Sequence, residues 1–364
     1  MSACTQCQRR SWLLGALNGR LEYVGRSPTR LAALLELSDE QLIEAVGGSE
    51  SEQLRRDYTG LAPERMALPR GVQQVCCHEP GFPRALARVS GTPRLLHVAG
   101  SLERLQELLA EPVVAIVGAR AASDYGMEVA HGLARGLAAS GITVVSGLAE
   151  GIATAAHEGA LEVKGPTLTV SAGGVDVCHP TSRRALQQRI YDAGCALAEL
   201  PCGRRPRSWC HTARARIVVA LASVVVVVEA GERPGELLHA RLARDASVPL
   251  AAVPGRVTSP LSVGTHALLR DGAHLVRDTQ DVLDVLYSMK QQSAVVSRRQ
   301  VTSPSPATEP RLRALLDAVA AGRDTVARLL ATGVAEQETL IGLARLECSG
   351  ALVRGDAGRY VARL

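Results

Sequence analysis

The stretch Val113-Val114-Ala115-Ile116-Val117-Gly118-Ala119-Arg120 decides the fold. Five apolar residues run without a break and then stop at glycine, as in a strand buried on both faces of a parallel sheet. Similar β-branched runs that end in glycine or a polar residue recur at 143–151, 167–174, 196–199, 224–229 and 250–255. Helical stretches separate them, for example at 125–139. The alternation predicts an α/β domain with a mostly parallel sheet.

Glycine and arginine lie where these strands are predicted to end. In open α/β sheets, ligands bind outside the carboxyl ends of the strands. Gly118-Ala119-Arg120 combines a turn that lets backbone amides approach an anion with a bidentate donor, and a helix start follows closely. Gly147 and Gly151 repeat this arrangement after the second strand. Two such ends favour a phosphodiester or nucleotide ligand, although ordinary βα turns also require glycine.

A basic segment lies between Glu199 and Glu229, where the sequence has no Asp or Glu. Its arginines are Arg204, Arg205, Arg207, Arg214 and Arg216. Charge of one sign attracts phosphate, and Trp209 within the segment offers a ring on which a base could stack. A solvated basic loop and a tryptophan that plugs the core are the alternatives.

Several common chemistries lack their motifs. No G-x-G-x-x-G follows the first strand and no Walker A sequence is present, so neither a dinucleotide cofactor nor P-loop ATP hydrolysis is supported. No spacing ties Ser146, His157, Asp176, His179 and Glu229 into a catalytic triad or carboxylate pair. Glu199 and Glu229 are expected to bind arginine or backbone amides. We predict no cofactor and no enzymatic activity.

Composition sets weaker bounds. The formal net charge of +5 is too small to identify a partner, and aromatic residues make up only 2% of the chain. The nine cysteines are scattered, as in reduced cytosolic proteins. Cys4-x-x-Cys7 resembles half of a zinc site, but the adjacent cysteines of Cys76-Cys77-His78 do not match common ligand spacings, so no metal is predicted. Neither a signal peptide nor a membrane span is recognised, which predicts a cytoplasmic protein that does not bind membranes.

The predicted organisation has four parts. Residues 1–70 form a helical module, residues 71–287 the α/β domain, residues 288–310 a flexible linker and residues 311–364 a winged-helix-like domain. The third helix of the last domain, Glu336–Cys348, carries three glutamates and one arginine. A helix that reads duplex DNA should be basic, so contact with a protein or plain packing is favoured for this domain.

The chain resembles the DNA-processing protein A family (DprA, also called Smf) from about residue 72 to residue 287. The matching stretches are Glu79-Pro80-Gly81-Phe82-Pro83-x-x-Leu86, Val114-Ala115-Ile116-Val117-Gly118-Ala119-Arg120, Val145-Ser146-Gly147-Leu148-Ala149-x-Gly151-Ile152, Gly174-x-Asp176-x-x-x-Pro180, Arg214-x-Arg216-Ile217-Val218, Val227-Val228-Glu229-Ala230, Val253-Pro254-Gly255 and Ser259-Pro260-Leu261-Ser262-x-Gly264-Thr265.

This resemblance implies an extended Rossmann-like domain that binds single-stranded DNA. It also implies a homodimer that protects incoming DNA and loads a RecA-type recombinase onto it during natural transformation. The family's strand-binding arginines fall on Arg120, Arg214 and Arg216. The N-terminal helices look similar to its sterile-alpha-motif-like domain.

The chain departs from the family pattern near the predicted strand ends. The departures are Ala119 for Ser, Glu150 for Arg, Ala153 for Asp, His211 for Phe, Ala215 for Asn, and Pro234-Gly235-Glu236-Leu237 for Ser-Gly-Ser-Leu. Glu150 replaces a positive charge beside the predicted phosphate path, which should weaken DNA binding.

We therefore predict a non-enzymatic binder of single-stranded DNA. Its predicted contacts are Gly118, Ala119, Arg120, Gly147, Gly151, Arg207, Trp209, Arg214 and Arg216. Two alternatives stay open at this point. One is a Rossmann-like enzyme that binds or hydrolyses a small nucleotide, and the other is an adaptor with a vestigial DNA site.

Overall fold

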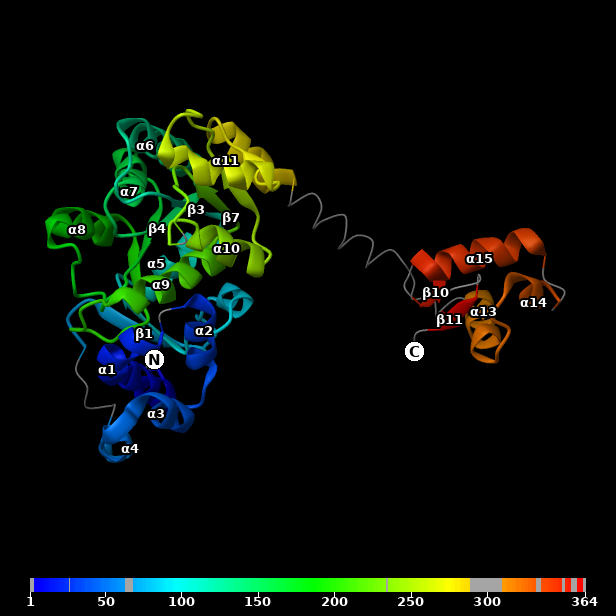
Figure 1. The fold of residues 1–364 in the computed structure, drawn as a ribbon, viewed down its shortest axis with the longest axis horizontal. Coiled ribbons are helices and arrows are strands. Elements are labelled where there is room, and N and C mark those ends of the chain that lie inside the picture. Colours follow the sequence, from blue (N-terminus) through cyan, green and yellow to red (C-terminus); the bar gives the residue numbers. More distant parts are fainter. Residues whose placement is uncertain are drawn as a thin grey trace. The chain divides into compact units, whose positions relative to one another are not determined.

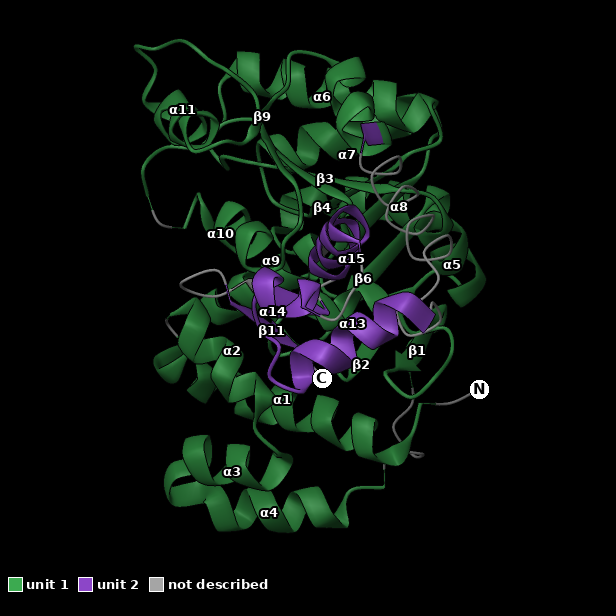
Figure 2. Cartoon of the chain, turned by 90° about the vertical axis from the view of Figure 1, so that its right-hand side faces the viewer, with its two compact units in different colours: residues 1–287 green, residues 288–364 purple. Residues whose placement is uncertain are grey.

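The computed structural model describes residues 3–25, 27–62, 68–233, 235–288, 310–331, 335–348, 351–354 and 359–362. The chain divides into two compact units, Met1–Tyr287 and Ser288–Leu364 (Figures 1 and 2). The helices predicted as a module at 1–70 lie within the first unit. Of the predicted linker 288–310, residues 289–309 lie outside the described residues.

Within the described residues, one nine-stranded sheet organises the first unit, in the order β1-β2-β6-β5-β4-β3-β7-β8-β9. The strands are β1 Val72–Cys76, β2 Leu95–Ala99, β3 Val113–Val117, β4 Thr143–Gly147, β5 Thr167–Val170, β6 Cys195–Ala198, β7 Val224–Val227, β8 Leu250–Ala252 and β9 His274–Leu275. β2 pairs antiparallel with β1 and β6, whereas the pairs from β6 to β9 are parallel. The predicted α/β, mostly parallel fold is confirmed.

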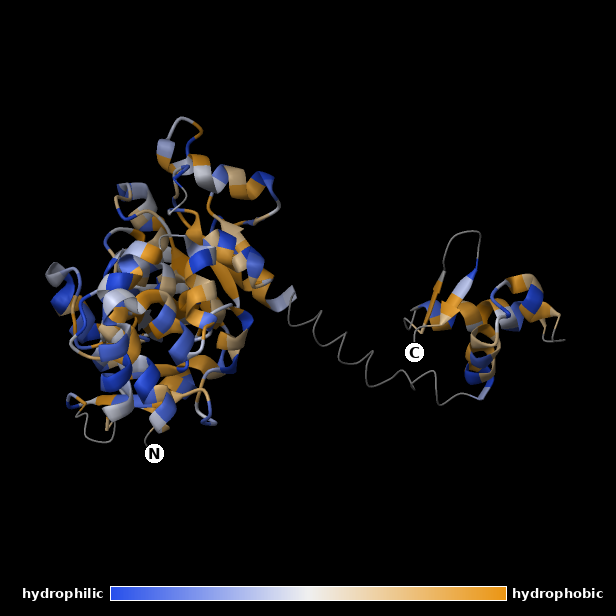
Figure 3. Cartoon of the chain, turned by 60° about the horizontal axis from the view of Figure 1, so that its bottom comes forward, coloured by the Kyte–Doolittle hydropathy of each residue, from blue (hydrophilic) through white to orange (hydrophobic). Residues whose placement is uncertain are grey.

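Helices cover both faces of the sheet (Figure 1). α6 (Asp124–Ala139) and α7 (Ile152–Glu162) lie on one side, and α9 (Ser208–Leu221) and α10 (Leu238–Asp245) on the other. Further α-helices of this unit are α5 Leu102–Ala110, α8 Arg184–Ala193 and α11 Val263–Arg270, and a helical stretch at 279–288 follows β9. Because β3 is covered on both faces, all five of its residues are buried, and Figure 3 shows hydrophobic residues along the strands.

Within the described residues, four α-helices precede the sheet: α1 Thr5–Val24, α2 Pro28–Glu36, α3 Asp39–Gly47 and α4 Ser51–Gly60. The Ser38 hydroxyl accepts a hydrogen bond from the Gln41 amide, and the Gln41 side chain accepts one from the Ser38 amide, which starts α3 with a capping box. Leu13, Leu17 and Leu42 form a core that includes residues of α9. The helices are thereby packed on the α/β domain. Their likeness to a sterile-alpha-motif domain stays a prediction.

The second unit contains α13 (Pro310–Ala320), α14 (Val326–Leu330), α15 (Glu336–Cys348) and the antiparallel pair β10 (Leu352–Arg354) and β11 (Tyr360–Ala362). Leu312, Leu329, Leu346 and Tyr360 contribute to its core. The order of elements is consistent with a winged helix, which stays a prediction. The predicted turn of the hairpin, 355–358, lies outside the described residues.

Among the described residues, we find no helix with the length and hydropathy that crossing a lipid bilayer requires.

Candidate nucleic-acid interface

A cavity of about 510 Å³ opens at the carboxyl ends of β3 and β4. From β3 the sheet grows in one direction through β4, β5 and β6, and in the other through β7 and β8. Such a reversal of strand order leaves a crevice where open α/β sheets bind ligands. Gly118, Arg120 and Gly147 line the cavity from the strand ends, and Arg214 lines it from α9. We call this space the carboxyl-edge cavity.

Arg214 is the most constrained cation of the carboxyl-edge cavity. Its residue is only 9% exposed, and its guanidinium lies against the end of β4. A Cβ atom on residue 147 would lie 2.6 Å from Cζ of Arg214, so only glycine admits the guanidinium here. The glycine at the end of the second strand thus makes room for a side chain as well as for a ligand.

Arg120 extends from the turn after β3, is exposed, and lines the same cavity as Arg214. Burial, and then the charge of Arg120, lower the pKa of Arg214 to about 10. Among the described residues, no carboxylate forms an ion pair with either arginine, and Nε of Arg214 has no hydrogen-bond partner. Two cations that line one cavity and have no ion-pair partner constitute a candidate site for an anionic ligand.

The N-terminus of α7 adds partial positive charge. The N-cap residue of this helix is Gly151, with φ of 72°, so no side chain caps the backbone amides of the first turn. That turn also contains no acidic residue. Ala153 of that turn lines the cavity. Glu229 instead binds at the start of α6, where its carboxylate accepts hydrogen bonds from the Ser123 amide and hydroxyl at 2.9 and 2.5 Å. The Ile152 amide donates to the Ala119 carbonyl at 3.2 Å. The next two amides of α7, those of Ala153 and Thr154, have no acceptor among the described residues and remain available to an anion.

Two histidines also line the cavity, His211 from α9 and His239 from α10. Burial, followed by the charges of Arg214 and Arg120, lowers the pKa of each to about 3. Both imidazoles are therefore neutral near pH 7, and Nδ1 of His211 is buried without a hydrogen-bond partner. The low pKa values reflect burial first and the two nearby arginine charges second.

The departures from the family pattern occupy different places. Ala119 and Ala153 line the cavity, as does His211, whereas Ala215 is buried in α9. Glu150 is exposed in the turn before α7 and does not line the space that Arg120 and Arg214 share. Glu236, which belongs to the last of these departures, lines the cavity, and its carboxylate accepts a hydrogen bond from the Gly231 amide. Within the described part of the chain it forms no ion pair with Arg120 or Arg214.

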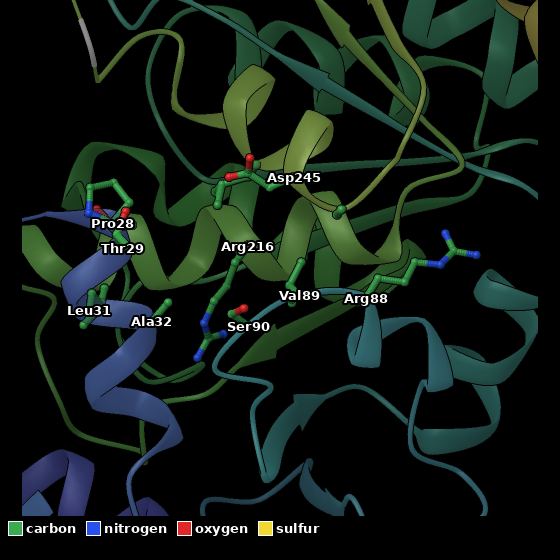
Figure 4. A pocket seen from close by; sticks show the side chains of 12 residues that line it. Pro28, Thr29, Leu31, Ala32, Arg88, Val89, Ser90, Arg216 and Asp245 are labelled. Atoms are coloured by element: carbon green, nitrogen blue, oxygen red, sulfur yellow. The ribbon is translucent and has the colours of Figure 1, made fainter. Parts of the chain in front are cut away.

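The structure corrects the expectation that Arg216 acts beside Arg214. Residues two positions apart lie on opposite sides of a helix. Nη2 of Arg216 lies 2.7 Å from each oxygen of Glu199, and the residue is only 4% exposed. Figure 4 shows Arg216 extending from α9 toward Ala32 of α2 and Ser90, in a separate pocket of about 190 Å³. Arg216 therefore lies near α2, and its ion pair is with Glu199, which follows β6.

Trp209 and Arg207 also lie outside the carboxyl-edge cavity. Trp209 is only 3% exposed, packs among the N-terminal helices, and donates from Nε1 to the backbone and side-chain oxygens of Asn18. Trp209 is therefore a core residue, which was the alternative to a stacking platform, because the first turn of α9 packs against α1. Arg207 is exposed at the N-cap of α9, close to Gly19.

The polar residues near the strand ends serve the structure. His157 is fully buried between Oγ1 of Thr167 and the Gly147 carbonyl, and burial lowers its pKa to about 4. Asp176 accepts from the Gly203 amide, at 2.8 and 2.9 Å. Glu199 and Glu229 bind an arginine and a helix start, respectively, as predicted.

Residues 234–237 were expected only as a departure from the family pattern, and no residue of the segment after β7 was predicted as a contact. Arg233, Gly235 and His239 nevertheless line the cavity. The position of Arg233 shortly after a predicted strand could have identified it. What could not be read was that β7 lies beside β3, because strand order is set by tertiary packing.

Comparisons with known proteins identify the family of the chain. A family model described as DNA recombination-mediator protein A matches residues 73–287. The putative DNA processing protein DprA of Mycobacterium tuberculosis strain H37Rv is 42% identical over 200 residues, which cover 55% of this chain and 51% of that protein. The chain thus spans about half the length of this relative. DprA of Streptococcus pneumoniae is 38% identical over 202 residues, which cover 56% and 70% of the two chains.

Two solved structures are similar. The X-ray structure of DprA from Streptococcus pneumoniae aligns with a TM-score of 0.62 and 29% identity, over 78% of this chain and 98% of that one. DNA processing protein A from Helicobacter pylori, in a structure that concerns its mode of single-stranded DNA binding, aligns with a TM-score of 0.53 and 31% identity, over 59% and 96%. Both are similar to this chain in fold as well as in sequence.

Proposed function

Since the chain belongs to the DNA recombination-mediator protein A family, we propose that it binds single-stranded DNA by seating backbone phosphates in the carboxyl-edge cavity. The observation that carries this proposal is Arg214. It is a buried cation beside Arg120, without a carboxylate partner among the described residues. Burying an unpaired cation is expensive, and a phosphate would supply the missing anion.

The donors favour a phosphate backbone over a base. Arg120, Arg214 and the start of α7 all provide N–H groups and positive charge, and none of them distinguishes one base from another. With Trp209 buried, stacking by that ring does not contribute. Binding should therefore depend steeply on salt and weakly on sequence. A flexible single strand can turn its backbone into a cavity more easily than a duplex can.

The wider role rests on family membership. The description of the family as a recombination mediator supports the proposal that the chain protects incoming single-stranded DNA and loads a RecA-type recombinase onto it. We propose that it does so in the cytoplasm, as a homodimer, during natural transformation. Loading is tested by whether the protein speeds recombinase assembly on a strand that is already coated. Sedimentation of the full chain tests the dimer.

A binding role is favoured over an enzymatic one. The strand-end carboxylate of Glu229 accepts hydrogen bonds from the Ser123 amide and hydroxyl at the start of α6. It does not line the carboxyl-edge cavity. Incubation with nucleoside monophosphates should give no product. Turnover that is lost in Glu229→Gln would favour the enzyme.

The central experiment is a mobility shift with single- and double-stranded oligonucleotides across a salt series. Arg120→Ala and Arg214→Ala should each weaken binding to all single strands alike, by about 10-fold or more, because a charge-assisted hydrogen bond contributes about 1.5–3 kcal/mol. Arg55→Ala, which removes an exposed arginine of α4, is the matched control and should bind normally. Full affinity in both cavity variants would reject this site.

A further inference from the structure

Three cysteines and a histidine converge where the first helix meets the first strand. Cys4 is the N-cap of α1 and Cys7 lies in its first turn, whereas Cys76 ends β1 and His78 follows it. One ligand atom from each of the four residues lies within 4.8 Å of all the others. Cys7 and His78 are 71 positions apart in the sequence, so this convergence is a product of the tertiary fold.

The separations fit one tetrahedral metal ion. With Zn–S of about 2.3 Å and Zn–N of about 2.0–2.1 Å, tetrahedral angles place sulfur and nitrogen about 3.6 Å apart. Nδ1 of His78 lies 3.3 Å from Sγ of Cys4 and 3.6 Å from Sγ of Cys7. All four cysteines at this junction are free rather than joined in disulfides.

The ligand set and its burial select the metal. Thiolate and imidazole ligands in a tetrahedron favour zinc over magnesium or calcium, which bind oxygen. Cys7 and Cys76 are buried in a cluster with Ala3 and Leu95, whereas His78 is exposed. Four protein ligands leave no open coordination position, which is typical of structural sites.

We propose that the chain binds one zinc ion through Cys4, Cys7, Cys76 and His78. The ion fastens the start of α1 to the end of β1. The side-chain amide of Gln8 donates to Gln74 at 3.1 Å and joins the same two elements. α1 also carries Leu13 and Leu17, which lie in one core with residues of α9, the helix of Arg214. Zinc would therefore hold the N-terminal helices in place against the sheet domain.

This proposal reverses the sequence expectation of no metal. That expectation rested on the adjacent cysteines of Cys76-Cys77-His78, which do not match a common spacing. In the structure, Cys77 is exposed and lies outside the group of four, although its Sγ is 3.9 Å from that of Cys7. The ligands on this side are therefore spaced as Cys-x-His, with Cys77 as the intervening residue.

The test is the zinc content of the full chain, purified under reducing conditions and measured by elemental mass spectrometry. We expect one zinc per chain in the natural protein and in Cys77→Ser, and close to none in Cys7→Ser and Cys76→Ser. Cys202→Ser changes a half-buried cysteine outside the cluster and should keep the zinc. If natural protein that was supplied with Zn²⁺ contains no zinc after purification, the proposal is overturned. Loss in Cys77→Ser but not in Cys76→Ser would overturn the ligand set.

A second measurement separates metal binding from misfolding. Cobalt-substituted protein should show the intense visible bands of tetrahedral thiolate coordination, and His78→Cys should keep the metal while shifting those bands. A chelator should lower the melting temperature of the natural protein and leave that of folded His78→Ala unchanged, because that variant has no ion to lose. An equal effect of the chelator on both proteins, or a cobalt spectrum without thiolate bands, would refute zinc at this place.

Discussion

Arg214 and Arg216 lie two positions apart on α9, and we predict that the same substitution has opposite effects on stability at the two positions. Methionine keeps an unbranched apolar chain and removes the charge. Arg214→Met should stabilise the first unit and abolish most DNA binding, since this cation is buried without a carboxylate partner among the described residues. Arg216→Met should destabilise it, since Glu199 would remain buried and unpaired.

The magnitudes follow from the two environments. A pKa lowered from 12.5 to about 10 corresponds to a cost of about 3 kcal/mol for the charged form of Arg214 in the folded state. That cost is fully present below pH 10 and fades as the pH rises toward 12.5. Because some side-chain contacts are lost, we expect a net gain of about 1–3 kcal/mol. Breaking the buried pair of Arg216 and Glu199 should instead cost about 3–5 kcal/mol.

Thermal unfolding of the full chain measures both effects, with roughly 2–4 °C expected for each kcal/mol. Anisotropy of a labelled single strand, at a temperature where both variants are folded, measures binding. Arg214→Met should lose at least about 10-fold in affinity, and its dependence of log affinity on log salt should become shallower by about 0.7. Arg216→Met should bind normally. A lower melting temperature for Arg214→Met with intact binding would refute the account of this site.

Three further predictions concern the same site. Phosphate in the cavity should raise the pKa of His211 and His239 from about 3, so single-strand affinity should increase as the pH falls from about 6 toward 4. A flat profile in the natural protein would contradict this, as would an unchanged slope in the double variant His211→Phe, His239→Gln. Glu150→Arg should tighten binding and steepen the slope of log affinity against log salt by up to about 0.7, and Glu150→Gln should be intermediate. Unchanged affinity in both variants would show that no phosphate passes this turn. Trp209→Ala should lower the free energy of unfolding by about 3–5 kcal/mol, and the folded variant should keep its affinity for single strands. A loss of about 1–3 kcal/mol in binding free energy would instead indicate that a base stacks on this ring.

The local sequence pattern was sufficient to predict the strands and the site residues that follow β3 and β4. The unbroken run Val113–Val117 can satisfy its backbone and bury its side chains only as an interior strand, so the sheet followed from its repeats. Because parallel strands end at one edge, Gly118, Arg120 and Gly147 were expected to converge, and they line one cavity. These inferences need only the periodicity of a strand and the composition of the turn that follows.

Side-chain direction and strand order required the tertiary structure. A helix rotates by about 100° per residue, so Arg214 and Arg216 face opposite ways, and which of them meets the cavity depends on how α9 packs. The sequence also leaves open whether Trp209 stacks on a base, and the structure decides this because the N-terminal helices cover the ring. The cysteines of α1 and β1 came together for the same reason, since a contact between segments so distant in the chain arises only when both are placed by one core.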